Sequence, residues 1–109
     1  MVARSTVILR ALKGVPLADP LVRDVVVATA HAIAERTGVR LLDLQWSPDA
    51  IMLSIDESRL AAIGFAAELR RLTNRWHAAR HPRVVPPPSL WGDPPAFDDP
   101  DPADWWKQG

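Results

Sequence analysis

The chain is 109 residues long, with 48% hydrophobic residues, 24% charged residues, no cysteine and a formal net charge of zero. That length allows one domain with a core, and the composition is that of a globular chain rather than a disordered one. The lack of cysteine excludes a disulfide framework and a thiolate zinc site. No apolar run approaches the roughly 20 residues that a membrane span needs, and the N-terminal stretch lacks the pattern of a signal peptide. We therefore expect a cytoplasmic protein that spans no membrane.

Charge is unevenly distributed along the chain. Residues 1–90 carry 12 basic and 8 acidic side chains, which gives +4, whereas residues 91–109 carry one lysine and five aspartates, which gives −4. The second segment is also rich in proline and tryptophan, and such a polar, proline-rich composition is typical of an extended tail. We therefore divide the chain into a folded domain, residues 1–91, and a Pro/Asp/Trp-rich C-terminal tail, residues 92–109.

Three segments have the pattern of strands. Residues 6–12 are rich in β-branched side chains, and residues 39–46 and 50–55 alternate between two faces. Between the last two, Ser47-Pro48-Asp49 has the chemistry of a tight turn, which predicts a hairpin. The residues expected to face the core are Val7, Leu9 and Ala11 in the first strand, Leu42, Leu44 and Trp46 in the second, and Ile51, Leu53 and Ile55 in the third.

One helix is predicted between the first two strands. Asp19 followed by Pro20 indicates its start, because a carboxylate can cap the first free N–H groups and proline suits the first helical position. The helix should run to about Arg36 and end at Gly38, since glycine adopts the left-handed conformation of a C-terminal cap at little cost. Its buried stripe is expected to comprise Val22, Val26, Thr29 and Ile33.

A second helix is predicted over residues 59–80, with Asp56 or Ser58 as its N-terminal cap and Pro82 ending it. Its apolar stripe comprises Phe65, Leu69, Leu72, Trp76 and Ala79. The order strand, helix, strand, strand, helix needs one more strand to complete a ferredoxin-like α+β sandwich, βαββα(β), with two helices on one face of an antiparallel sheet. The best candidate for that last strand is residues 89–91, at an edge of the sheet because prolines precede them.

Four stretches of the chain, in order, are STVILRALKGVPL, IAERTGVRLLDLQWSPDAIMLSI, LRRLTNRW and LWGDPPAF. Together they resemble the REP-associated tyrosine transposases, which belong to the insertion sequence 200-like, single-tyrosine branch of the HUH superfamily. Pro48, Asp49 and Leu53 match the frame of that family's Pro-Asp/Asn-His-hydrophobic-His-Leu motif, Asn74-Arg75-Trp76 is similar to its helix pattern, and Leu90-Trp91 is similar to its later element. The resemblance spans about residues 5–98 and implies a ferredoxin-like fold and a role in DNA transposition.

The residues that would carry this family's chemistry are replaced. The two metal-binding histidines of the motif align with Ala50 and Met52, and the histidine of the first strand aligns with Thr6. A methyl group and a thioether are poor ligands for the hard divalent cation that polarises the scissile phosphate. The sequence contains no tyrosine, so the nucleophile is missing too. We therefore expect a degenerate, C-terminally truncated relative with no catalytic residue, no metal and no cofactor, in which Ala50 and Met52 are packing residues or, as an alternative, line a remodelled ligand pocket.

Basic side chains gather in the second predicted helix, where no acidic residue lies between Glu68 and Asp93. Such a ridge can contact phosphates, although a solvated helix face has the same composition. The candidates for DNA contact are Arg70, Arg71, Asn74, Arg75, His77 and Arg80. His77 and His81 have a spacing that can bind a metal, but no third ligand is evident, so we expect them to be surface histidines.

The tail carries several large aromatic residues, which are costly to leave exposed. We expect part of the segment after Trp91 to pack against the domain, on the sheet face that presents Ala50, Met52 and Ser54. Docking on a partner is the alternative.

Three hypotheses about function remain open at this point. The first is a catalytically inactive transposase-like domain that binds single-stranded or hairpin DNA and forms a homodimer. The second is a ferredoxin-like protein–protein interaction or dimerisation module that binds no nucleic acid. The third is a decayed gene product without a function. Salt-dependent DNA binding would separate the first from the others.

Overall fold

The computed structural model describes residues 4–86 and 88–92 of the chain. The elements are, in order, β1 (Arg4–Arg10), the 3-10 helix η1 (Pro16–Ala18), α1 (Pro20–Thr37), β2 (Leu41–Ser47), β3 (Ala50–Asp56) and α2 (Arg59–Ala79). Neither α-helix is long and apolar enough to span a membrane. The predicted tail, apart from Gly92, and its docking on the sheet lie outside the described residues.

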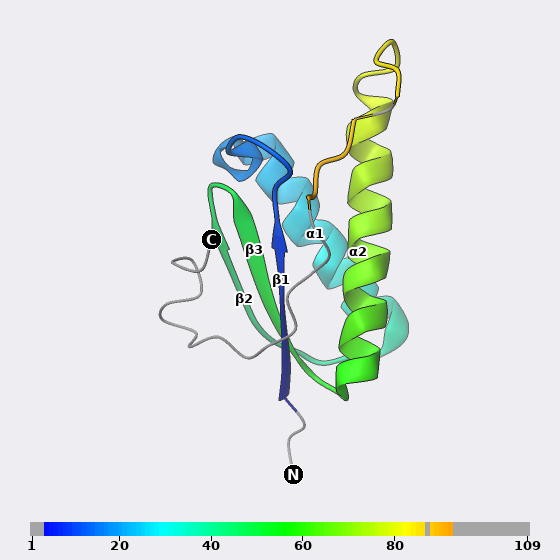
Figure 1. The fold of residues 1–109 in the computed structure, drawn as a ribbon. Helices are drawn as coiled ribbons and strands as arrows, with labels where there is room; N and C mark the ends of the chain where they lie inside the picture. Colours follow the sequence, from blue (N-terminus) through cyan, green and yellow to red (C-terminus); the bar gives the residue numbers. More distant parts are fainter. Residues whose placement is uncertain (1–3, 87, 93–109) are drawn as a thin grey trace.

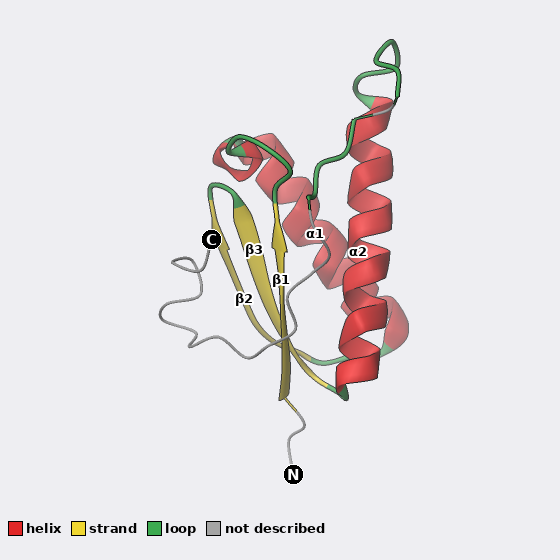
Figure 2. Ribbon diagram, viewed as in Figure 1, coloured by secondary structure: helices red, strands yellow, loops and turns green. Residues whose placement is uncertain are grey.

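The three strands form one antiparallel sheet in the order β1-β3-β2. The two long helices pack against the same face of that sheet (Figures 1 and 2). The hairpin between β2 and β3 turns at Pro48 and Asp49, where the Ser47 hydroxyl lies 3.0 Å from Oδ1 of Asp49. This is the ferredoxin-like α+β arrangement that the order of elements predicts, which confirms the fold class.

Among the described residues, the fourth strand is a single pairing at the predicted edge. Trp91 forms an isolated antiparallel bridge with Ala11, just beyond the end of β1. Two backbone hydrogen bonds flank it, from Leu12 N to Leu90 O at 3.1 Å and from Gly92 N to Arg10 O at 2.9 Å. Residues 90–92 thus pair with the free edge of β1. The prolines that precede them have no N–H to donate, which limits how many strand hydrogen bonds the segment can form.

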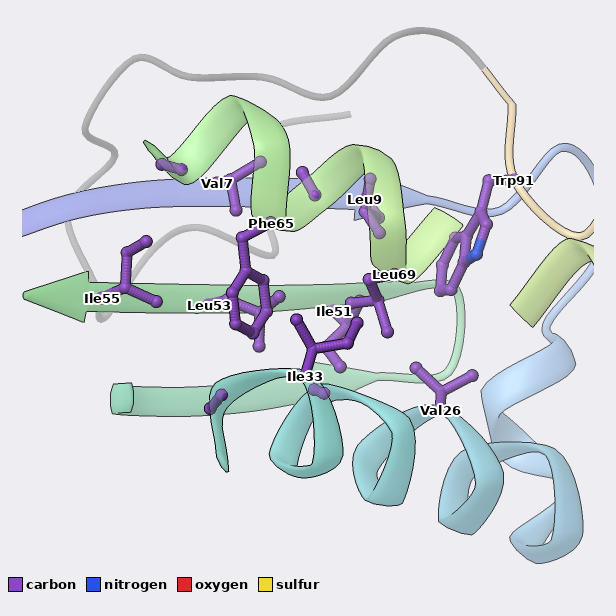
Figure 3. Close-up of a cluster of buried hydrophobic side chains, with 14 of the residues drawn as sticks. Val7, Leu9, Val26, Ile33, Ile51, Leu53, Ile55, Phe65, Leu69 and Trp91 are labelled. Carbon is purple, nitrogen blue, oxygen red and sulfur yellow. The ribbon is translucent and has the colours of Figure 1, made fainter. Parts of the chain in front are cut away.

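The main core lies between the sheet and the two helices. Val7, Leu9 and the odd-numbered apolar residues of β3 point toward α1 and α2, where they meet Ile33, Phe65 and Leu69 (Figure 3). Trp91 is also part of this core and is only 1% exposed. The period of two along the strands and of about 3.6 along the helices therefore predicts most of the buried face.

Both helix starts have the caps that the sequence indicates. Asp19 accepts a hydrogen bond from Leu21 N at 2.9 Å, and Ser58, rather than Asp56, caps α2 by accepting from Ala61 N at 3.2 Å. At the end of α1, Gly38 has φ of 72°, a left-handed conformation that a side chain would strain. These local rules explain why the predicted helix bounds agree with the structure to within a residue or two.

The predicted inward face of β2 was wrong in part. The pairing with β3 shifts between Leu41 and Asp43, so that Leu42 is an extra residue and Leu41, not Leu42, packs with Leu44 against the core. Trp46, expected to be buried, is 44% exposed at the sheet edge, where the Arg23 guanidinium lies 4.6 Å from its ring centroid. The extra residue of a bulge moves the side chains on one side of it to the opposite face of the sheet. Nothing in the local sequence predicts where such a bulge forms.

The structure also corrects the predicted end of β1 and one residue in the predicted buried stripe of each helix. β1 ends at Arg10 rather than Leu12, because the chain after Arg10 leaves β3 and pairs with the segment of Trp91. On α1, Ala30 is buried where Thr29, whose hydroxyl donates to Val25 O, is only half-buried. On α2, Ala79 is exposed because the helix continues past the sheet at that point.

Candidate nucleic-acid interface

The C-terminal turns of α2 and the loop that follows extend beyond the end of the sheet (Figure 1). This end of the helix carries the predicted basic ridge, because no acidic residue occurs between Glu68 and Asp93. The structure separates the six candidate residues into those that stabilise the fold and those that face solvent. Whether any of them contacts DNA stays a prediction.

Arg70 and Asn74 hold the segment that follows the helix. The Arg70 guanidinium donates to Gly92 O at 2.6 Å. Oδ1 of Asn74 accepts from Leu90 N at 2.8 Å and lies 3.4 Å from Trp91 N. These contacts give both side chains a structural role at the interior edge of the ridge.

Thr73 is a neighbour of this pair that the sequence analysis missed. It is fully buried, and its hydroxyl accepts the indole N–H of Trp91 at 2.8 Å while it donates to Leu69 O at 2.6 Å. The one available signal was a threonine inside the apolar stripe of an amphipathic helix. A buried hydroxyl needs a partner, and a tryptophan downstream offers one.

Arg71 is engaged in an exposed ion-pair network at the start of the ridge. Glu68 pairs with Arg71 at 2.6 Å and with Arg36 of α1 at 3.2 Å. The hydrogen bond between Arg71 and Glu68 lowers the pKa of the Glu68 carboxyl and raises that of Arg71. Arg71 is therefore partly neutralised, and Glu68 links the two helices through its pair with Arg36.

Arg75 and Arg80 are exposed on the projecting end of α2. Within the described residues, no hydrogen bond or ion pair involves Arg75. The Arg80 guanidinium lies 4.8 Å from the centroid of the Trp76 ring, a stacking contact that leaves its N–H groups accessible. Arg83 and His81, in the same projecting part of the chain, are also exposed.

His77 is half-buried between this basic end and the core. Its Nδ1 is shielded from solvent and has no hydrogen-bond partner among the described residues. Burial lowers the pKa of His77, and the neighbouring charges of His81 and Arg80 lower it further. The His77 and His81 rings meet edge to face with centroids 5.0 Å apart, so the His77 side chain packs against the next turn of the chain.

The three positions that align with metal-binding histidines share the other face of the sheet. In the register of β1 and β3, Thr6 pairs with Ser54 and Ile8 pairs with Met52, so Thr6, Ala50 and Met52 all point away from the helices. The Thr6 and Ser54 hydroxyls lie 2.8 Å apart and hydrogen-bond to each other. Ile8, Ala50 and Met52 form a second buried cluster, separate from the main core.

This set of side chains does not fit a divalent cation. A methyl group, a thioether and two mutually bonded hydroxyls provide none of the carboxylate or imidazole ligands that such an ion prefers. Among residues 4–86 and 88–92, no three His, Cys, Asp or Glu side chains are grouped as metal ligands. No step of metal-assisted chemistry can be derived from these residues.

An apolar hollow of about 200 Å³ lies between α1 and the first turns of α2. Ile33 and Phe65 line it, Glu68 lies at its rim, and Gly64 leaves it open. Leu60 and Ile63, on the same turns of α2, are exposed. This surface is apolar and lies at the opposite end of α2 from Arg75 and Arg80.

Comparison with solved structures shows where this fold occurs. The chain matches the crystal structure of a "putative transposase" from Deinococcus radiodurans R1 with a TM-score of 0.72 and 17% sequence identity, over 98% of this chain and 85% of the other. No protein-family model matches the chain, and no curated protein matches it. The two chains share a fold, and at this identity the likeness extends to the fold alone.

Proposed function

We propose that this chain is a transposase-like domain of the single-tyrosine HUH type, related to REP-associated tyrosine transposases, that has lost catalysis and binds single-stranded or hairpin DNA. The fold that it shares with the Deinococcus protein supports the transposase-like part of this proposal. The order of motifs from β1 to Trp91 supports the narrower family. DNA contact, the loss of catalysis and a homodimeric state are proposals that need their own tests.

The replaced positions on the sheet support the loss of catalysis. Thr6, Ala50 and Met52 lie on the same face of two adjacent strands, at the positions that the resemblance assigns to metal-binding histidines, but their side chains bind no hard cation. The sequence also has no tyrosine to attack a phosphate. Fold and chemistry have therefore diverged in this chain.

The single observation that carries DNA binding is the charge at the projecting end of α2. Arg75, Arg80 and Arg83 are exposed there, and Glu68, the nearest acidic residue before them in the chain, is already paired with Arg36 and Arg71. Within the part of the chain that the structure describes, no acidic side chain pairs with these arginines, and arginines on a projecting element can reach a phosphate backbone without a matching groove.

The test is fluorescence anisotropy with labelled single-stranded and hairpin oligonucleotides over a series of salt concentrations. Each phosphate contact contributes about 0.7 to the slope of log affinity against log salt for a single strand. We expect R75A/R80A/R83A to reduce that slope by roughly 2. The control R36A/R40A/R59A removes the same charge at the opposite end of α2 and should leave most of the slope intact. An equal loss in both variants, or no binding by the native chain, would refute a site at this end.

A second assay addresses catalysis directly. The purified protein, incubated with Mg²⁺ or Mn²⁺ and a hairpin single-stranded substrate, should release no cleaved strand and form no covalent protein–DNA adduct. A denaturing gel that separates the adduct by mass would reveal either product. An adduct would overturn the proposal of a catalytically inactive domain.

A second candidate function is a dimerisation module without nucleic-acid binding. The observation in its favour is the apolar hollow between α1 and α2 beside the exposed Leu60, which is 78% exposed. If this surface joins two copies, L60E should convert a dimer to a monomer in sedimentation analysis while leaving DNA binding unchanged.

A further inference from the structure

The first half of α2 carries apolar residues on the side that faces away from the core. Leu60 is 78% exposed and Ile63 is 42% exposed, and Gly64 and Ala67, on neighbouring turns, are also exposed. Gly64 also lines the apolar hollow between α1 and α2. We call these four residues the outer face of α2. Because the inner side of the same turns is already buried in the core, the helix has the pattern of an element that packs against two neighbours.

We propose that the outer face of α2 joins two copies of this chain, with the two α2 helices antiparallel and a two-fold axis at Gly64. The proposal rests on the homodimeric state proposed above and assigns its interface. It does not depend on whether the chain binds DNA.

The two ends of the outer face carry opposite charges. Glu57 directly precedes the cap of α2, Ser58, and Arg71 lies two turns beyond Gly64; both are exposed. Each is seven residues from Gly64, or about 10 Å along the helix. A two-fold axis at Gly64 reverses the direction of the helix, so Glu57 of each copy comes to lie beside the partner's Arg71, and the contact occurs twice in the dimer.

The charge balance around Arg71 favours this contact. Arg71 and Arg36 share one carboxylate, that of Glu68, so this exposed network has one positive charge in excess. Within the described residues, no ion pair involves the Glu57 carboxylate. Each copy therefore offers a positive charge at one end of the outer face and a negative charge at the other, which an antiparallel second copy complements.

The sizes of the residues suit the same arrangement. A Cβ added at Gly64 would meet no other part of the chain within 4 Å, so packing within one copy gives no reason for glycine, which is less favourable than alanine inside a helix. At the axis, its lack of a side chain lets two helices approach closely. Leu60 lies about one turn before Gly64 and Ala67 about one turn after it, so each Leu60 comes to lie over the partner's Ala67, a large residue on a small one.

This pairing leaves the basic ends of both helices free. Arg75 is 11 residues beyond Gly64, so the two copies of Arg75 would lie about 33 Å apart along the helices. The projecting C-terminal turns of α2 would extend past the partner in opposite directions. The interface and the candidate end for DNA contact are therefore separate, and each can be altered without the other.

Charge reversal tests the pairing by sedimentation over a series of protein concentrations at low salt. E57R and R71E should each raise the dissociation constant of the dimer by about 10-fold or more, because both contacts become repulsive. A mixture of the two variants should form a heterodimer, in which both contacts again join opposite charges, and E57R/R71E should recover self-association. D24R and R83E, which make the same changes of charge at exposed positions outside the outer face, are the controls and should associate like the native chain.

A second measurement uses the apolar part of the face. L60E should also raise the dissociation constant by about 10-fold or more, because each dimer would bury two carboxylates. Far-UV circular dichroism shows whether each variant is folded. R71E also loses its pair with Glu68; if it does not fold, E57R and L60E decide the question, and dimers unaffected by both would overturn the proposal.

The remaining outcomes separate this interface from the proposed function. A native chain that stays monomeric at every concentration would overturn both the interface and the homodimeric state. A native dimer that E57R, R71E and L60E leave intact would overturn the interface alone. Variants that dissociate but do not associate when mixed would overturn the pairing of Glu57 with Arg71 about Gly64. Anisotropy with hairpin DNA reports on DNA binding independently of all three results.

Discussion

The indole N–H of Trp91 donates to the buried hydroxyl of Thr73 at 2.8 Å, across 18 residues of sequence. This bond fixes the end of the described chain against α2 and seats Trp91 in the core. T73V should therefore destabilise the protein by about 1–3 kcal/mol, because the buried indole N–H loses its acceptor while the volume of the side chain is kept. Chemical denaturation followed by far-UV circular dichroism measures the change.

T73S is the matched control, since it keeps the hydroxyl and removes only a methyl group. We expect it to cost less than T73V. If T73V were as stable as the native protein, the hydrogen bond would contribute nothing and burial alone would hold Trp91.

Asn74 is predicted to affect stability more than DNA binding. Its Oδ1 accepts from Leu90 N at 2.8 Å, so N74A should lower the free energy of unfolding by about 1 kcal/mol. N74D keeps an acceptor at the same place and should retain more stability. Anisotropy with hairpin DNA, measured where all variants are folded, should show little change. A large loss of affinity in N74A with unchanged stability would instead make Asn74 a contact residue.

His77 should make the protein less stable in mild acid. Its folded-state pKa lies below the ordinary 6.5, chiefly because of burial and also because of His81 and Arg80. The unfolded chain then binds the proton more readily, so stability is complete above about pH 6.5 and falls as the pH drops from there through the folded-state pKa. Thermal melts from pH 7.5 to 5 should show this fall in the native protein and a weaker one in H77Q. The same change at exposed His31 is the control, and equal profiles for H77Q and the native protein would assign the acid effect to other groups.

Local sequence patterns predict where the helices and strands begin and end better than they predict how these elements pack against one another. Asp19, through its capping carboxylate, and Gly38, through its left-handed backbone, determine the limits of α1, and the alternation in residues 50–55 predicts both faces of β3. The bulge at Leu42 was not predictable in this way, because it depends on how β2 fits the central strand. Trp46 keeps its predicted face, since it pairs with the core residue Ile51, but it lies on the edge strand, where it is exposed.

The candidate site shows the same limit. The run of arginines is visible in the sequence, but its division is not: Arg70 is bound to Gly92 and Arg71 to Glu68, whereas Arg75 remains exposed. The partners that make this division lie 22 residues away in one case and 3 in the other. The pair of Arg71 and Glu68 follows from helix spacing alone, whereas the contact of Arg70 with Gly92 depends on the fold.

Placing histidine on the sheet should not create a metal site. Met52 is fully shielded and packs with Ile8 and Ala50, so M52H places an imidazole in an apolar cluster without a designed partner. We expect a loss of about 2 kcal/mol or more, from reduced apolar burial and an unsatisfied ring nitrogen. M52L, which conserves volume, should cost less than about 1.5 kcal/mol. Urea denaturation with and without Mn²⁺ measures both effects. If A50H/M52H gained stability with added Mn²⁺, in proportion to the logarithm of its concentration, the face would have kept the geometry of a metal site and lost only its ligands.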